Sequence, residues 1–159
     1  MMHNWFECSI RYEKVAENGM NRKVTEAYLV DALSFTEAEA RLIEEMNPYI
    51  NGEFTVSGVK RAGYSELFPS EEYAADRWFK CKLFFITLDE KSGAEKKTST
   101  TVLVQASDLR DAVKKLGEGM KGTLADYVIG SASETAIMDV SPYTADVKPE
   151  FSGDDKKEV

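Results

Sequence analysis

The sequence predicts an α+β fold in which one β-β-α-β unit is written twice, and three observations lead to this prediction. The stretch WFECSIRY, beginning at Trp5, recurs as WFKCKLFF, beginning at Trp78. Strand-sized segments alternate apolar and polar residues, and each pair of them is followed by one amphipathic helical pattern. A three-stranded sheet with one helix cannot cover both of its faces. We therefore expect a tandem duplication that forms one pseudo-twofold domain, with an antiparallel sheet and two helices.

The repeat extends well beyond the Trp-Phe-x-Cys stretches. The shift of 73 residues that superposes them also places FTVSG at 54–58 on YVIGS at 127–131. A shift of 74 residues places YLVDA at 28–32 on VLVQA at 102–106. The predicted organisation is a first repeat at 1–69, a linker at 70–77, a second repeat at 78–143 and a mobile, charged tail at 144–159.

The first strand of each repeat is read from its alternation. Phe6, Cys8 and Ile10 alternate with polar residues, so we expect Phe6 and its counterpart Phe79 to face the core. Neighbouring side chains of a strand point to opposite faces, so Trp5 and Trp78 are expected to be turned away and exposed. The stretches Glu17-Asn18-Gly19 and Lys91-Ser92-Gly93 predict hairpin turns. Second strands are expected at Val24–Val30 and Thr100–Val104.

A helix and a closing extended segment follow in each repeat. Thr36 with Glu39 suggests a capping box for the first helix, which Asn47-Pro48 ends. The second helix is expected to open at Ser107 and to stop within Gly117–Gly122. The closing segments run from Phe54 to Leu67 and from Tyr127 to Val140, with the last strand of each unit either continuous or broken in two. Their Ser-Gly and Gly-Ser pairs suggest a bulge.

Composition limits the function classes. With 28 acidic and 20 basic residues the formal charge is −8, which disfavours nonspecific nucleic-acid binding. Apolar runs are only strand-sized, so no membrane span is expected, and the first residues lack the pattern of a secretory signal. Two cysteines and one histidine cannot build a zinc site alone. The expectation is a cytoplasmic protein without cofactor or metal, in which Cys8 and Cys81 are small buried hydrophobes.

Motifs for catalysis are weak throughout the sequence. Residues 117–122 fit the pattern GxGxxG, but a dinucleotide site needs a strand before it and a helix after it, and here the order is reversed. Glu37, Glu39, Glu44 and Glu45 follow the spacing of a solvated helix face. We therefore expect no enzymatic activity.

A non-enzymatic binding or accessory protein is the leading functional hypothesis. Pockets favour the junctions of pseudo-symmetric halves, where the ligand would be a protein or a small molecule such as a nucleotide. A homo-oligomer is left open. The candidate ligand-binding residues are Lys60, Arg61, Tyr64, Glu134 and Thr135.

The alternative hypothesis is a protein associated with single-stranded nucleic acid. Trp78, Lys80, Lys82 and Phe84 share the face of their strand opposite the core, and aromatic and basic residues on a sheet face can stack bases and hold phosphates. Packing of this face against the other repeat or another subunit is the competing interpretation, and the net charge favours it.

Three stretches carry a resemblance to a known family: the Trp-Phe-x-Cys openings, VDALSFTEAEAR at 30–41 and FTVSGVKRAGYSELF at 54–68. To about residue 143 the chain resembles a family of uncharacterised proteins, of unknown function, from Bacteroidetes and their phages. The resemblance implies a small intracellular protein with an accessory role in a phage or prophage. It carries no catalytic residues across.

Overall fold

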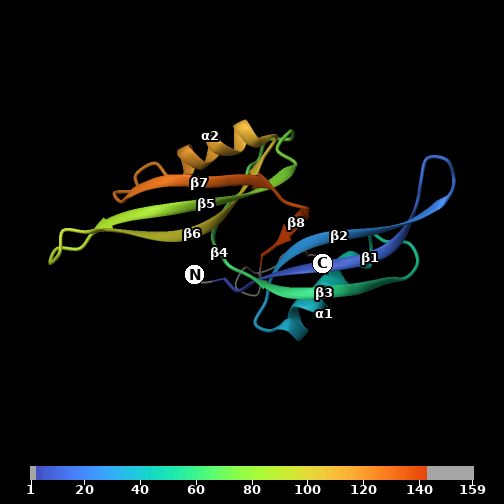
Figure 1. Cartoon of the computed structure of the whole chain (residues 1–159). Coiled ribbons are helices and arrows are strands. Elements are labelled where there is room, and N and C mark those ends of the chain that lie inside the picture. The colour runs from blue at the N-terminus through green and yellow to red at the C-terminus, as the bar shows by residue number, and fades with distance from the viewer. Residues whose placement is uncertain (1–2, 143–159) are drawn as a thin grey trace, which may run out of the picture. The chain divides into compact units, whose positions relative to one another are not determined.

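The computed structural model describes residues 3–142, which form two helices and eight strands (Figure 1). The α+β class is therefore confirmed, and the predicted tail at 144–159 lies outside the described residues. Within the part of the chain described, no helix is both long and apolar enough to cross a membrane. In chain order the elements are β1 (Trp5–Val15), β2 (Asn21–Asp31), α1 (Phe35–Met46), β3 (Phe54–Ala62), β4 (Tyr64–Phe68), β5 (Arg77–Leu88), β6 (Glu95–Ala106), α2 (Leu109–Gly119), β7 (Asp126–Glu134) and β8 (Ile137–Ser141).

The strands form two sheets, in the orders β3-β1-β2-β8 and β4-β6-β5-β7, where the sequence predicted one. The chain divides into two compact units: residues 63–138 form unit 2, and the described residues on either side of them form unit 1. Each closing segment is broken in two, after Ala62 and after Glu134. The second piece then joins the sheet built by the other half of the sequence, β4 beside β6 and β8 beside β2. Because β4 runs parallel to β6, the sheets are antiparallel only in part.

Both hairpins turn where the sequence predicted. Gly19 and Gly93 have φ angles of 82° and 72°, in the left-handed region that glycine enters without strain. The amide of Met20 donates to the Asn18 side chain, and the amide of Lys91 donates to Asp89. These local bonds satisfy backbone groups that the ladder leaves open at the turn.

The predicted bulges are also present, at equivalent places in the two units. In unit 1 the β1–β3 register shifts between Ser9 and Ile10, so that Ser57 of β3 has no direct opposite. The β5–β7 register of unit 2 shifts between Lys82 and Leu83, which leaves Gly130 of β7 extra. Each bulge therefore lies at the small-residue pair that suggested it.

Each unit has its own core between one sheet face and one helix. The core of unit 1 contains the fully buried Phe6, Cys8 and Ile10, and that of unit 2 contains Phe79, Cys81 and Leu83. The inward positions predicted for both cysteines are confirmed, and both are free thiols. Burial, with Glu7 adding to it, raises the pKa of the Cys8 thiol to about 11, and burial raises the pKa of Cys81 as well. Thiols held in this protonated form are poor nucleophiles.

The predicted exposure of the tryptophans is wrong. Trp5 and Trp78 do lie on the sheet face opposite the helix, but only 6% and 4% of their surfaces are exposed. The register explains why this face is apolar there: the pairs Glu7–Leu29 and Lys80–Leu103 place a fully buried leucine diagonally beside each tryptophan. Apolar residues on both faces of a strand indicate that both faces are covered.

The helix starts differ from the predicted ones by one or two residues. Ser34, not Thr36, caps α1: its hydroxyl accepts from the Glu37 amide at 3.1 Å, and Glu37 accepts from the Leu33 amide at 2.6 Å. The N-cap of α2 is Asp108, which accepts from the Asp111 amide at 2.8 Å. Two overlapping Ser/Thr-x-x-Glu stretches lie in the α1 sequence, and β2 ends early enough for the first to be used.

Ser34→Ala is therefore expected to lower the free energy of unfolding by about 1 kcal/mol, because the Glu37 amide at the start of α1 loses its partner. A urea titration followed by circular dichroism measures the change. The matched control is Thr36→Ala, for which no loss is expected since Thr36 lies exposed inside the helix. A larger loss for Thr36→Ala than for Ser34→Ala would contradict the assigned cap.

Candidate functional site: a cavity beside helix α2

A cavity of about 690 Å³ opens between α2 and the segment that follows β4. It is wide open to solvent and lies entirely within unit 2. The β4 side supplies an aromatic ring, a proline and two carboxylates, whereas α2 supplies a lysine, a carboxylate and a glycine. The residues that line it are Phe68, Pro69, Ser70, Glu71, Glu72, Lys115, Glu118 and Gly119.

The pairing of β4 with β6 positions the aromatic wall. Phe68 stands opposite Val104 in the parallel register and packs against the core of unit 2. Its ring lies against Gly119, where a Cβ atom would come within 2.8 Å of the ring Cδ1. The Ser70 amide donates to the side chain of Gln105 at 2.9 Å, which fixes the chain as it leaves β4. A glycine at the end of α2 therefore allows Phe68 to form the wall of the cavity.

Lys115 is the central charged group, and its ammonium makes three polar contacts of 3.0 Å. It donates to Ser70 Oγ and Glu72 Oε1 and forms an ion pair with Asp111 Oδ2. Although desolvation acts to lower the pKa of Lys115, its bonds to Glu72 and Asp111 raise it above the ordinary value. Three contacts use the three protons of an ammonium group. Lys115 therefore holds the cavity together and presents no spare donor to a ligand.

Asp111 completes this arrangement from one turn earlier in α2. Its Oδ2 accepts from the backbone amide of Ser107 at 3.0 Å and from the Ser107 hydroxyl at 3.1 Å. The Ser107 amide, and then Lys115, lower the pKa of Asp111. This carboxylate therefore stays charged beside Lys115 at neutral pH.

The remaining charges around the cavity are negative. Lys115 is matched by Asp111 and Glu72, while Glu71 and Glu118 are exposed carboxylates on the lining. Helix α2 ends at Gly119 with no basic residue in its last turn. The carbonyl end of a helix carries about half a negative charge. Together with the Phe68 ring, these groups form an environment suited to an organic cation.

Unit 1 contains a related cation on α1. Arg41, which the shift of 74 residues places on Lys115, donates to the backbone oxygens of Asp31 and Pro142 and contacts Ser141 Oγ at 3.2 Å. It also pairs with Glu45 at 3.2 Å. In each unit, a basic residue of the helix thus binds the chain at the end of a short edge strand, β8 in unit 1 and β4 in unit 2.

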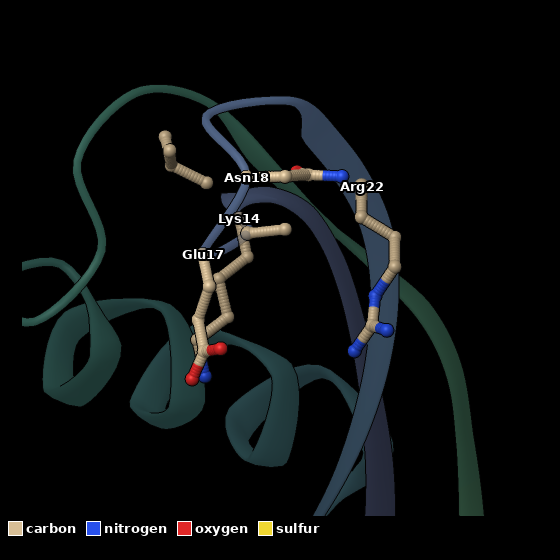
Figure 2. Close-up of a pocket in the computed structure, with 6 residues that line it drawn as sticks. Lys14, Glu17, Asn18 and Arg22 are labelled. Atoms are coloured by element: carbon tan, nitrogen blue, oxygen red, sulfur yellow. The ribbon is translucent and has the colours of Figure 1, made fainter.

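A second cavity, of about 620 Å³, lies at the β1–β2 turn. Lys14, Glu17, Asn18 and Arg22 surround it (Figure 2), and Val15 and Ala16 complete the lining. Its lining belongs to one hairpin end, it mixes both signs of charge, and it contains no aromatic ring. It is therefore less suited to selective binding than the cavity beside α2.

The five residues predicted to bind a ligand do not form one group within either unit. Lys60 and Arg61 are neighbours on β3, so they face opposite sides of the sheet: Lys60 lies 3.9 Å from Glu7, and Arg61 stacks over Phe6 and Phe35. In unit 2, Tyr64 is half-buried on β4, Glu134 pairs with Arg77 at 3.7 Å, and Thr135 donates to the Trp78 carbonyl at 2.9 Å. Their role as a binding site stays a prediction.

Of the residues predicted for nucleic-acid binding, Trp78 is buried and offers no ring surface for base stacking. Lys80 and Lys82 are exposed on the same face, and Lys82 Nζ lies 5.4 Å from the centre of the half-buried Phe84 ring. Three of the four residues thus remain accessible.

Among the described residues, no group of three or more His, Cys, Asp or Glu side chains could hold a metal ion. Lys115 is held protonated, and both cysteines are buried.

A family model described as Domain of unknown function (DUF4494) matches residues 4–143. The chain belongs to this family. No curated protein and no solved structure shows a significant match. Membership of DUF4494 therefore brings no assigned activity.

Proposed function

We propose that this DUF4494 protein is a non-enzymatic binding protein whose cavity beside α2 takes a positively charged group, a primary ammonium or a guanidinium, of a protein or small-molecule ligand. One observation carries the proposal: Lys115 is fully engaged, which leaves Glu71, Glu118 and the Phe68 ring as the groups that a ligand meets. An ammonium or guanidinium gains from carboxylates, from the carbonyl end of a helix and from an aromatic face at once.

The proposal extends to the cellular role and origin of the chain. The resemblance noted in the sequence supports an accessory function in a phage or prophage. Two free, buried cysteines support a reducing compartment such as the cytoplasm. Tandem duplication of one unit is supported by the matching strand orders of the two sheets and by the equivalent positions of Arg41 and Lys115.

Binding of small probes tests the ligand class. Nα-acetyl-lysine methylamide and Nα-acetyl-arginine methylamide are expected to shift the amide resonances of Ser70 and Gly119 in a titration followed by ¹⁵N–¹H spectra. The uncharged Nα-acetyl-norleucine methylamide should shift them little. The double variant Glu71→Gln/Glu118→Gln is expected to weaken the lysine probe about 5-fold, because it removes two partly solvated charge interactions.

A matched control removes the same charge elsewhere. Glu13 and Glu90 are exposed near the two hairpin turns, so Glu13→Gln/Glu90→Gln should leave the affinity of the lysine probe unchanged. Equal binding of the norleucine probe, or an equal loss in the control variant, would refute selection for a cation at this cavity.

A further inference from the structure

The sheet of unit 2 has a second face, opposite α2, whose outer part is exposed. On β5 this face carries Lys80, Lys82, Phe84 and Ile86, since their neighbours Phe79, Cys81 and Leu83 point into the core. The register adds hydroxyl groups from both neighbouring strands: Thr101 pairs with Lys82 from β6, while Ser133 and Ser131 pair with Lys80 and Lys82 from β7.

Positive charge gathers on this face although the whole chain is acidic. Lys80, Lys82 and Lys97 are all exposed and all lie on it, because Lys97 pairs with Ile86. The acidic side chains that these three strands place on the same face are Glu95 and Asp126, opposite Leu88 and Ile86 at the far end. Glu134 pairs with Phe79, whose side chain points to the α2 side of the sheet. Screening at physiological salt limits each distant charge to about 8 Å, so Lys80 and Lys82 decide the potential at their end of the face, whereas Lys97 lies at the end that also carries Glu95 and Asp126.

The Phe84 ring lies against the bulge in β7. At Gly130 an added Cβ atom would clash with ring atoms of Phe84, so the ring lies directly over the backbone of the extra residue. Lys82 Nζ lies 5.4 Å from the ring centre. An aromatic ring that packs against the sheet backbone beside Lys82 offers a surface for a base and a neighbouring charge for a phosphate.

The same face of unit 1 provides a contrast. Its β1 strand carries Glu7, Arg11 and Glu13 at positions where β5 has Lys80, Phe84 and Ile86, and Glu7 pairs with Lys60 at 3.9 Å. It has mixed charge and no aromatic ring at the position of Phe84. The two faces therefore differ in the features that a polyanion would recognise.

We propose that the exposed face of β5, β6 and β7 binds single-stranded nucleic acid through Lys80, Lys82 and Lys97, with Phe84 stacking on a base. Charge complementarity selects this occupant over a second copy of the chain, because a second copy would bring three more lysines to this face and only Glu95 and Asp126 to offset them, whereas a nucleic acid brings phosphates alone. The inference is independent of the cavity beside α2, and it involves no contribution from the buried Trp78.

Fluorescence anisotropy of the full chain with 5′-fluorescein-labelled dT₁₅ and U₁₅, at 50 to 200 mM salt, tests the proposal. Lys80→Gln/Lys82→Gln is expected to weaken binding about 10-fold. It should reduce the slope of log affinity against log salt by about 1.4, at roughly 0.7 for each lost phosphate contact on a single strand. Phe84→Leu is expected to weaken binding about 5-fold or more, because base stacking on the ring is lost. Comparison of the two oligonucleotides shows whether DNA or RNA is preferred.

The control is Lys14→Gln/Lys23→Gln, which removes the same charge from the exposed hairpin of unit 1 and should leave binding unchanged. Melting curves of all variants exclude unfolding as the cause of a loss. An equal loss in the control, or no binding of either oligonucleotide at 50 mM salt, overturns the proposal. It is also overturned if light scattering shows a dimer that Phe84→Leu dissociates, since the face would then be covered by a second copy.

Discussion

Phe79→Ala is expected to lower the free energy of unfolding by about 3 to 5 kcal/mol, the cost of removing a large aromatic side chain from a packed core. Only 2% of Phe79 is exposed, and it packs in the core of unit 2 with Cys81, Val104 and Leu116. The remaining cavity adds to the lost burial, because surrounding strands relax only in part. A guanidinium titration followed by tryptophan fluorescence and by circular dichroism measures the change.

Two further variants test whether the loss of stability depends on burial of the side chain. Trp78→Ala should also destabilise strongly, because Trp78 is almost fully buried on the other sheet face. Its unfolding is followed by circular dichroism, since one tryptophan is removed. Tyr73→Ala changes a fully exposed aromatic residue and should stay within about 0.5 kcal/mol of the parent. A loss below 1 kcal/mol for Phe79→Ala would mean that the assigned register of β5 is wrong.

The tryptophans show how far alternation predicts a strand. Period two places Trp78 and Phe79 on opposite faces, and the structure agrees. Alternation on one strand cannot tell whether the second face is covered, because this depends on neighbours such as Leu103. Local chemistry was enough elsewhere: Gly19 and Gly93 specify turns, and the small residues near Ser57 and Gly130 specify bulges.

Long-range pairing was not predictable in the same way. The strands β4 and β8 have only five residues each, and their short patterns fit any sheet edge. The partner of β4 is β6, more than 30 residues later in the chain, so the two-sheet arrangement could not be read from periodicity.

The cavity illustrates the same limit for the site. Asp111 and Lys115 have the i, i+4 spacing of a surface helix pair, which is how such a pair is read without a structure. What makes them part of a site are Ser70 and Glu72, 45 and 43 residues away from Lys115. A useful signal was present in the repeat, since Arg41 and Lys115 are equivalent basic residues on the two helices.

Strands β4 and β8 each join the sheet built by the other half of the sequence. This arrangement predicts that a chain cut in the segment between β4 and β5 stays assembled. Tyr73 is fully exposed there, so a specific protease site inserted after it can be cleaved in the folded protein. The two fragments are expected to remain together as a 1:1 complex. The first fragment supplies β4 to the sheet of unit 2, and the second supplies β8 to the sheet of unit 1.

Side-chain bonds add to this pairing across the cut. Lys115 of the second fragment binds Ser70 and Glu72 of the first, and Arg41 of the first binds Ser141 and Pro142 of the second. Native mass spectrometry and size-exclusion chromatography with light scattering should therefore show the mass of the intact chain after cleavage, and two separate fragments in guanidinium. The fragment with residues 74–159, produced alone, should unfold at lower denaturant than the complex, because the edge of β6 has lost β4 and core residues lose the Phe68 ring. Fragments that separate in native buffer would show that β4 and β8 do not hold their places in the two sheets.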